Sequence, residues 1–138
     1  MTFTHLGLAF ATALALLTPA PSAHADAKSI AVKRLVLAHG VANHEPSDAT
    51  TTFKQNDDRV YAFVEVENPT GAKTGVSVVF VSPKGETMGA IPLAVGETQR
   101  FRTWAFTRKA HEAGEWSVII REDGKHKVLA RQTFTVAK

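Results

Sequence analysis

Hydrophobic and polar residues alternate with a period of two along most of the chain, a pattern typical of half-buried β-strands. The segment 59–67 (RVYAFVEVE) shows this most clearly, because a valine or alanine occupies every second position. The segment 75–82 (GVSVVFVS) is nearly continuously apolar, as expected of a central strand that is covered on both faces. In all, the pattern predicts seven strands, at 30–36, 59–67, 75–82, 87–93, 98–106, 115–121 and 128–136.

The stretches between the predicted strands are polar or rich in turn-forming residues. The strand at 87–93 contains Gly89 and Pro92, which indicates a position at a sheet edge. The polar stretch 43–58 is long enough to form an irregular connection, and only 107–113 (TRKAHEA) has a pattern that would allow one or two turns of helix. Chain reversals are expected at 68–71 (NPTG), 83–86 (PKGE) and 122–125 (EDGK).

Short strands with turns at fairly even spacing, and no alternation of strands with helices, predict an all-β fold. We expect an immunoglobulin-like antiparallel β-sandwich of about seven strands, with a small β-barrel as the alternative. Trp116 alternates with Val118 and Ile120 on one face of its strand, so we place it deepest in the core. The predicted core residues are Trp116, Phe101, Val118 and Phe134.

The first 25 residues contain no Lys, Arg, Asp or Glu and include the apolar run 6–17 (LGLAFATALALL). The triplet 23–25 (AHA) then places small residues at the two positions that a signal peptidase reads. The apolar run is shorter than the roughly 20 residues that span a bilayer. The alternative is an N-terminus that is disordered or retained at the membrane. We therefore expect a cleaved signal peptide at 1–25, a single domain at 26–138, and an exported protein that is periplasmic or secreted.

The charge and the lack of cysteine narrow the choice of partners and chemistry. The chain contains 16 Lys and Arg, 13 Asp and Glu and no Cys, for a net charge of +3. The absence of Cys excludes disulfides, thiol nucleophiles and thiolate metal sites. The basic residues are scattered, which argues against nucleic acid and slightly favours anionic partners. We also expect no cofactor, and no stable membrane insertion once the leader is removed.

One predicted strand combines arginines with aromatic residues. Alternation places Arg100, Arg102, Trp104 and Phe106 on one face of this strand, and Arg108 follows directly. A guanidinium binds carboxylate or phosphate through two hydrogen bonds, while an indole offers a flat face to sugars or cations. We therefore predict a surface that binds an envelope protein or an anionic glycan, formed by Arg100, Arg102, Trp104 and Arg108. In the alternative interpretation, these arginines pair internally and tie strands together through Glu45, Glu65 or Glu67.

The candidate catalytic or metal-binding side chains form one local cluster, which comprises His39, His44, Glu45 and Asp48. Their spacing matches no standard zinc pattern, and the chain lacks a Gly-x-Ser-x-Gly motif. We therefore predict neither a metal site nor a nucleophilic triad. The turn 43–46 (NHEP) would either anchor the long connection against the sandwich or form the rim of a site with Arg102.

Several short signatures occur in order along the chain. They are 43–46 (NHEP), 59–66 (RVYAFVEV), 100–104 (RFRTW), 114–118 (GEWSV), and Gly124 with 128–130 (VLA) and 134–136 (FTV). This order resembles the domain-of-unknown-function family 2914, small bacterial extracytoplasmic domains with a β-sandwich-like fold. The resemblance implies the fold and the location, and no activity, substrate or cofactor. That family often carries a His and a Trp before its Gly-Lys turn, whereas this chain has Val78, Val79 and Phe80.

Together these observations predict a non-catalytic binding or interaction module of the cell envelope. The alternative is an envelope hydrolase or metal-dependent enzyme centred on His39, His44, Glu45 and Asp48. The two functions require different structures. A binding module needs an open arginine and tryptophan face, whereas an enzyme needs the four clustered side chains to converge in a cleft. The sequence leaves the oligomeric state open.

Overall fold

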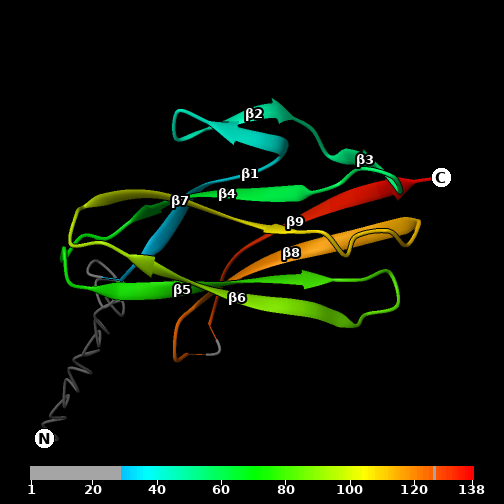
Figure 1. Cartoon of the computed structure of the whole chain (residues 1–138). Helices are drawn as coiled ribbons and strands as arrows, with labels where there is room; N and C mark the ends of the chain where they lie inside the picture. The colour runs from blue at the N-terminus through cyan, green and yellow to red at the C-terminus, as the bar shows by residue number, and fades with distance from the viewer. Residues whose placement is uncertain (1–28, 126) are drawn as a thin grey trace, which may run out of the picture.

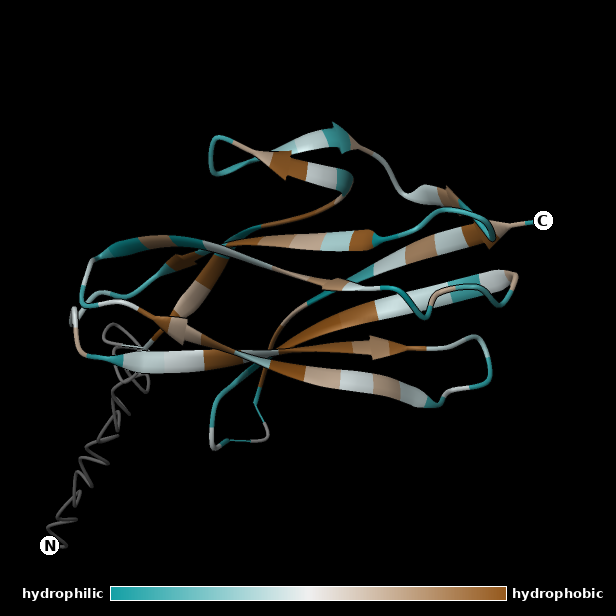
Figure 2. Cartoon of the chain, in the orientation of Figure 1, coloured by the Kyte–Doolittle hydropathy of each residue, from teal (hydrophilic) through white to brown (hydrophobic). Residues whose placement is uncertain are grey.

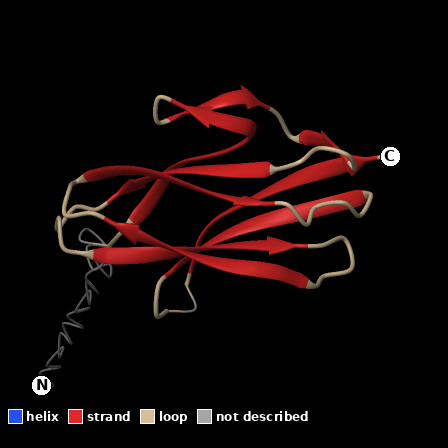
Figure 3. Ribbon diagram, viewed as in Figure 1, coloured by secondary structure: helices blue, strands red, loops and turns tan. Residues whose placement is uncertain are grey.

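The computed structural model describes residues 29–125 and 127–138, which form nine β-strands and no helix (Figure 1, Figure 3). The predicted signal peptide at 1–25 lies outside the described residues. No helix within the described ranges is long and apolar enough to cross a membrane. The strands are β1 (Ala31–Ala42), β2 (Glu45–Ala49), β3 (Thr52–Lys54), β4 (Val60–Glu67), β5 (Thr74–Val81), β6 (Thr87–Val95), β7 (Arg100–Thr107), β8 (Gly114–Glu122) and β9 (Val128–Ala137).

The strands form two facing sheets, ordered β2-β1-β4-β7 and β3-β9-β8-β5-β6 (Figure 1). Neighbouring strands are antiparallel except for β3 and β9, which run parallel. If β1, β4 and β7 are named A, B and E, and β5, β8 and β9 are named C, F and G, the two sheets contain A-B-E and G-F-C. This is the central strand order of an immunoglobulin-like sandwich, which confirms the predicted fold class.

The core lies between the two sheets and is built from the alternate residues of the strands. Trp116 and Val118 are almost completely buried, and the Trp116 ring stacks on Phe134 of β9 with the ring centroids 6.0 Å apart. The Trp116 Nε1–H donates a 2.8 Å hydrogen bond to the backbone oxygen of Glu112, which satisfies the only polar atom of the indole. Phe101 is half-buried and packs against the rim of the core. Figure 2 shows hydrophobic residues along the strands and hydrophilic residues at the turns.

The sequence predicted an irregular connection at 43–58, but this segment contains the strands β2 and β3. Asn43 and His44 both have positive φ angles, 52° and 58°, and Ala42 pairs with Glu45. Two central residues with positive φ define the tight hairpin turn that suits the twist of two antiparallel strands. The sequence pattern missed both strands because β2 is polar and β3 has only three residues, of which Phe53 alone is buried in the core.

The predicted helix at 107–113 is also wrong. Thr107 is the last residue of β7 and pairs with Val60, and the following residues form an irregular crossover to β8. A helix this short is unstable unless its surroundings support it. Here the surroundings stabilise the irregular conformation instead. The Gln55 side chain donates a 2.9 Å hydrogen bond to the backbone oxygen of His111, and the Ala110 side chain is buried.

Candidate binding face

The outer face of the four-stranded sheet carries rows of opposed side chains across β1, β4 and β7. In an antiparallel pair, directly opposed residues point to the same side of the sheet. One row consists of Arg34, Glu65 and Arg102, so a carboxylate stands between two guanidiniums. We call the surface formed by Arg34, Glu65, Arg100, Arg102 and Trp104 the arginine face.

The Glu65 carboxylate is the buried centre of this face, with only 8% of its side chain exposed. Three guanidiniums surround it. Arg34 Nη1 and Arg102 Nε each lie 3.7 Å from Glu65 Oε2, and Arg100 Nε lies 3.8 Å from Oε1. Burying a carboxylate is costly unless opposite charges compensate it, so the arginines are what allow Glu65 to occupy this position.

A second carboxylate reaches the arginine face from the β1–β2 hairpin. Glu45 Oε1 lies 2.7 Å from Arg102 Nη1, and Glu45 Oε2 lies 3.2 Å from Arg34 Nη1. The His44 ring meets the Trp104 ring edge-on at 5.5 Å. The hairpin therefore folds over the sheet that it belongs to, and the turn 43–46 makes contact with Arg102.

The aromatic part of the face lies beside the charged part. Phe63 is opposite Trp104 in the β4–β7 register and is completely buried, although it points to the outer side of the sheet. The Arg34 guanidinium covers the Phe63 ring, 5.3 Å from its centroid. A cation over an aromatic face is attracted to the ring electrons, so Arg34 has both a carboxylate and an aromatic partner.

The structure brings Arg100, Arg102 and Trp104 together but places Arg108 elsewhere. Arg108 follows the end of β7, where its guanidinium lies 5.8 Å from the centroid of the Phe106 ring. Arg59 lies over the same ring at 4.7 Å. Its Nη1 donates a 3.0 Å hydrogen bond to the Tyr61 hydroxyl, which raises the pKa of the Arg59 guanidinium.

The sequence analysis did not identify Arg34 as part of the arginine face, and it did not predict the contact between Arg59 and Phe106. Arg34 lies in a predicted strand, and alternation gives its side of the strand but not the strand that lies beside it. Arg59 precedes β4 and reaches Phe106 only because β7 pairs with β4. The pairing of Arg34, Arg100 and Arg102 with Glu45 and Glu65 is the internal arrangement that the sequence offered as the alternative.

Of the four residues of the suggested catalytic cluster, His39 and Asp48 contact each other, whereas His44 and Glu45 have other partners. His39 Nδ1 lies 2.8 Å from Asp48 Oδ2, and His39 Nε2 lies 3.2 Å from Asp57 Oδ2. His44 packs on Trp104, and Glu45 pairs with arginines. Among residues 29–125 and 127–138, no group of three His, Cys, Asp or Glu side chains is arranged to hold a metal ion.

Asp57 joins His39 to the β3–β4 connection. Its Oδ2 accepts a 2.8 Å hydrogen bond from the backbone N–H of Lys54, and this bond lowers the pKa of the Asp57 carboxyl. The contact with His39 lowers the pKa further, while desolvation opposes both effects. His39 also packs on Phe53, with ring centroids 4.9 Å apart. The contacts of His39 with Asp48, Asp57 and Phe53 hold the β2–β3 region against β1, which is a structural role.

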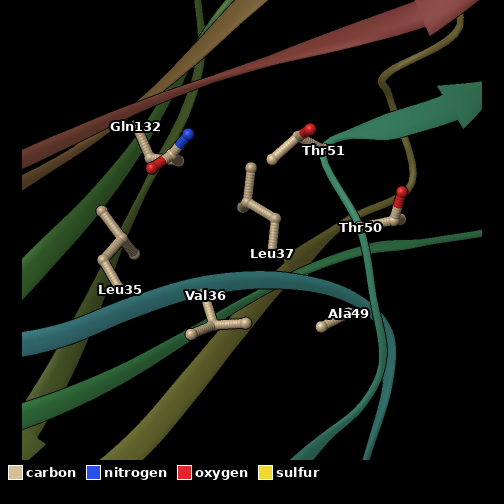
Figure 4. A pocket seen from close by; sticks show the side chains of 7 residues that line it. All are labelled: Leu35, Val36, Leu37, Ala49, Thr50, Thr51 and Gln132. Carbon is tan, nitrogen blue, oxygen red and sulfur yellow. The ribbon is translucent and has the colours of Figure 1, made fainter.

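A pocket of about 370 Å³ lies between β1, the β2–β3 connection and β9 (Figure 4). Figure 4 shows the side chains of Leu35, Leu37 and Gln132 around this space. None of its lining residues is ionisable, so the lining offers no general acid or base, and the hydroxyls of Thr50 and Thr51 have no base beside them among these residues. The lining residues are Leu35, Val36, Leu37, Ala49, Thr50, Thr51 and Gln132.

Neither a family model nor a curated protein sequence matches the chain. Among solved structures, an immunoglobulin-like protein from Pseudomonas aeruginosa gives a TM-score of 0.46 at 15% identity, over 78% of this chain and 91% of that one. A β-glucosidase from Listeria innocua, solved in complex with glucose, gives 0.49 at 10% identity, over 79% of this chain and 16% of that one. A β-glucosidase from Kluyveromyces marxianus gives 0.45 at 17% identity, over 79% of this chain and 14% of that one.

This chain therefore corresponds to most of the first protein but to a small part of either glucosidase. Similarities of this strength carry no information about function. The assignment of the chain to the immunoglobulin-like sandwiches rests on its own strand order.

Proposed function

We propose that the protein is a non-catalytic interaction module of the cell envelope that binds an acidic partner protein through the arginine face. The observation that supports this most is the engagement of Glu45 by two guanidiniums, at 2.7 Å from Arg102 and 3.2 Å from Arg34. A carboxylate supplied by a partner would bind guanidiniums of this face through the same kind of contact. Glu45 is therefore an internal example of the ligand group that we propose.

The charges of the arginine face favour an added anion. The three guanidiniums form ion pairs with two carboxylates, those of Glu45 and Glu65. Glu67 lies opposite Arg100 in the strand register but pairs with Lys33 at 2.8 Å, so the face keeps an excess of one positive charge. Arg100 is the most available, since 75% of its side chain is exposed and its contact with Glu65 is 3.8 Å long. Complementary charge at an interface speeds association and selects the partner.

The neighbouring aromatic side chains give the face an apolar component. Trp104 is half-buried beside the arginines, and Phe106 has 40% of its surface exposed. Trp and Arg are the residue types that most often dominate the binding energy of protein interfaces. This combination favours a protein partner over a purely ionic polymer.

The proposal of a non-catalytic role rests on the dispersal of the candidate catalytic side chains. His39, His44 and Glu45 each have a separate set of contacts, and the pocket beside Leu35 has no ionisable lining residue.

The envelope location rests on the leader predicted at 1–25. Cell fractionation of the full chain and of a chain lacking 1–25 tests that location, and a cytoplasmic full-length chain would contradict it.

The binding proposal is tested with poly-L-glutamate as the probe, titrated against the purified protein at two salt concentrations. We expect binding that weakens with salt, because exposed charges are screened. The double variant Arg100→Ala/Arg102→Ala should lose at least about tenfold in affinity. The matched control is Arg121→Ala/Arg131→Ala, which removes two arginines from β8 and β9 of the other sheet and should bind normally.

Two results would overturn the proposal. Equal losses in both double variants would mean that only the net charge matters. Binding of polygalacturonate in place of poly-L-glutamate would identify an anionic glycan as the ligand instead of an acidic protein. A circular dichroism spectrum of each variant confirms that the sandwich is still folded.

A further inference from the structure

The edge of the four-stranded sheet at β7 lacks the proline, bulge or short length that often prevents a further strand from pairing, and charged side chains, Arg100 and Arg102, protect it instead. Open edges are usually short, kinked or interrupted by proline. Within the described part of the chain, β3 has three residues, β2 contains Pro46 and a positive φ at Asp48, and β6 contains Pro92 and a positive φ at Gly89. β7 instead runs for eight residues without Gly or Pro. Its register with β4 is unbroken.

The hydrogen-bond pattern shows which backbone groups of β7 face the open edge. The Asn68 N–H donates to the Gln99 oxygen at 2.7 Å, and this pair continues the β4–β7 register. Opposed residues of an antiparallel pair alternate between hydrogen-bonded and non-hydrogen-bonded positions. The residues of β7 that bond to β4 are therefore Phe101, Thr103, Ala105 and Thr107. The residues whose N–H and C=O groups point away from β4 are Arg100, Arg102, Trp104 and Phe106, although the Arg100 oxygen already accepts a 2.6 Å hydrogen bond from the Thr98 hydroxyl.

The same four residues carry the outward side chains of β7. A strand added at this edge would form backbone hydrogen bonds with them and would also meet their guanidiniums and aromatic rings. β6, the neighbouring edge strand of the other sheet, lies close to β7 without pairing with it. No described strand occupies the position beside β7 in its own sheet.

β4 shows which side chains fit opposite β7. Directly across from the four edge residues it places two acids and then two aromatic residues. An added antiparallel strand would meet the same four side chains in the same order, because they project from the sheet surface and not toward one neighbour alone. The observed pairs are Glu67 with Arg100, Glu65 with Arg102, Phe63 with Trp104, and Tyr61 with Phe106.

We propose that the β7 edge is a strand-addition site for an extended segment of the acidic partner, in which two aromatic residues precede two acids at alternate positions. This inference rests on the proposed function and adds the manner of binding. Main-chain hydrogen bonds supply affinity in such sites and alternate side chains supply specificity. The acids of the partner segment pair with Arg100 and Arg102, and its aromatic residues pack on Trp104 and Phe106.

A second copy of the chain fits this edge less well. Antiparallel pairing of two β7 strands about Thr103 would place Arg100 opposite Phe106 and Arg102 opposite Trp104. That arrangement supplies no carboxylate to Arg100, whose side chain is 75% exposed and 3.8 Å from its nearest carboxylate oxygen. An acidic segment supplies one at the opposed position.

The test uses the heptapeptide Tyr-Thr-Phe-Thr-Glu-Thr-Glu and two derivatives that differ only in backbone N-methylation. In the first derivative the Phe and both Glu residues are N-methylated, which removes amides that would face β7. In the second the three Thr residues are N-methylated, which removes amides that would face away. We expect the parent peptide and the second derivative to bind with similar affinity, and the first to lose at least about tenfold, since each blocked bond leaves an unpaired group.

Amide hydrogen exchange gives an independent readout. In the free protein the amides of Arg102, Trp104 and Phe106 should exchange quickly, and those of Phe101, Thr103 and Ala105 slowly. Adding the parent peptide should slow the first set. Slow exchange of the first set without peptide would overturn the proposal, because the edge would already be covered. A concentration-dependent dimer in sedimentation equilibrium would identify the cover as a second copy.

The peptides also separate this inference from the proposed function. Equal binding of the two N-methylated derivatives, lost in the Arg100→Ala/Arg102→Ala variant, would overturn strand addition and leave the arginine face as an ordinary side-chain site. Failure of all three peptides and of poly-L-glutamate to bind would overturn both. A peptide with Lys in place of each Glu is the charge control and should not bind.

Discussion

Arg102 and Glu45 lie 2.7 Å apart although they belong to the two opposite edge strands of one sheet, β7 and β2. The contact is possible because β1 pairs with β4 through Ala38 and with β2 from Ala38 onward, so the β1–β2 hairpin leaves the plane of the sheet. The hairpin then covers part of the outer face, where His44 meets Trp104 and Glu45 meets Arg102. The Glu45 carboxylate consequently occupies hydrogen-bond donors of Arg102 and Arg34 that a partner's carboxylate could otherwise use.

The first prediction concerns that carboxylate. Glu45→Gln removes the charge that competes for Arg102 and Arg34 while keeping the shape of the side chain. We expect tighter binding of poly-L-glutamate, and a change of no more than about 1 kcal/mol in the free energy of unfolding, because both pairs are solvent-exposed. Isothermal titration and urea unfolding measure the two effects. Weaker binding in the variant would mean that Glu45 orders the site and does not compete for it.

The second prediction compares the two tryptophans. Trp116→Ala should lower the free energy of unfolding by about 3–5 kcal/mol, because it empties a buried site stacked on Phe134. Trp104→Ala should cost less, since Trp104 is half-buried on the outer face, and should weaken peptide binding instead. Chemical denaturation followed by circular dichroism measures the stability. A larger loss of unfolding free energy in Trp104→Ala than in Trp116→Ala would show that Trp104, and not Trp116, makes the main core contact.

The third prediction concerns stability in acid. The pKa of Asp57 is lowered in the folded protein from its ordinary value of 3.8, chiefly by the Lys54 N–H. The unfolded chain therefore binds a proton first as the pH falls, so the stabilisation is present at pH values well above 3.8 and is lost as the pH drops through the folded pKa. Asp57→Asn should show a smaller loss of stability between pH 5 and pH 3 than the wild type.

Asp58→Asn is the control for that measurement, because it removes a neighbouring carboxylate that is 78% exposed. Urea unfolding of all three proteins at both pH values gives the comparison. If the loss of stability on acidification is the same in Asp57→Asn as in the wild type, the hydrogen bond from Lys54 does not contribute to stability.

The fourth prediction uses two glycines with positive φ. Gly114 has φ 135°, and a Cβ there would lie 2.9 Å from the Pro83 ring, whereas Gly89 has φ 144° with nothing within 4 Å. Gly114→Ala should therefore destabilise more than Gly89→Ala, by about 1–3 kcal/mol, the cost of overpacking. Thermal unfolding of the two variants isolates the clash from the backbone strain that they share. Equal losses would show that Pro83 moves aside freely.

The alternation in residues 100–106 predicted the outward set Arg100, Arg102 and Trp104, and these residues do share one face. Alternation could not predict Arg34 as the third guanidinium, because the side of a strand does not specify its neighbour. It also grouped Arg108 with them, although Arg108 lies past the end of β7 beside Phe106. A period of two applies only while the chain remains extended.

The His39–Asp48 segment shows the same limit more strongly. Closeness in sequence suggested one cluster, but the turn at Asn43 and His44 reverses the chain, so His39 pairs with Asp48 while Glu45 faces Arg102. Two positive φ angles decide this arrangement, and they require no glycine that would mark them in the sequence. Asn tolerates such angles well, but the residue type alone does not impose them.

The order of residues along the chain was enough to predict the all-β class, most strand positions and the inward set around Trp116, because a period-two pattern is a local property of an extended chain. It also determined the order of arginine and aromatic residues along β7. Contacts between strands, by contrast, bring Glu45 of the hairpin onto Arg102, bury Glu65 among three guanidiniums, and make β7 an edge strand among the described residues. Those properties depend on which strands are neighbours, and strand pairing is fixed by contacts between distant parts of the chain.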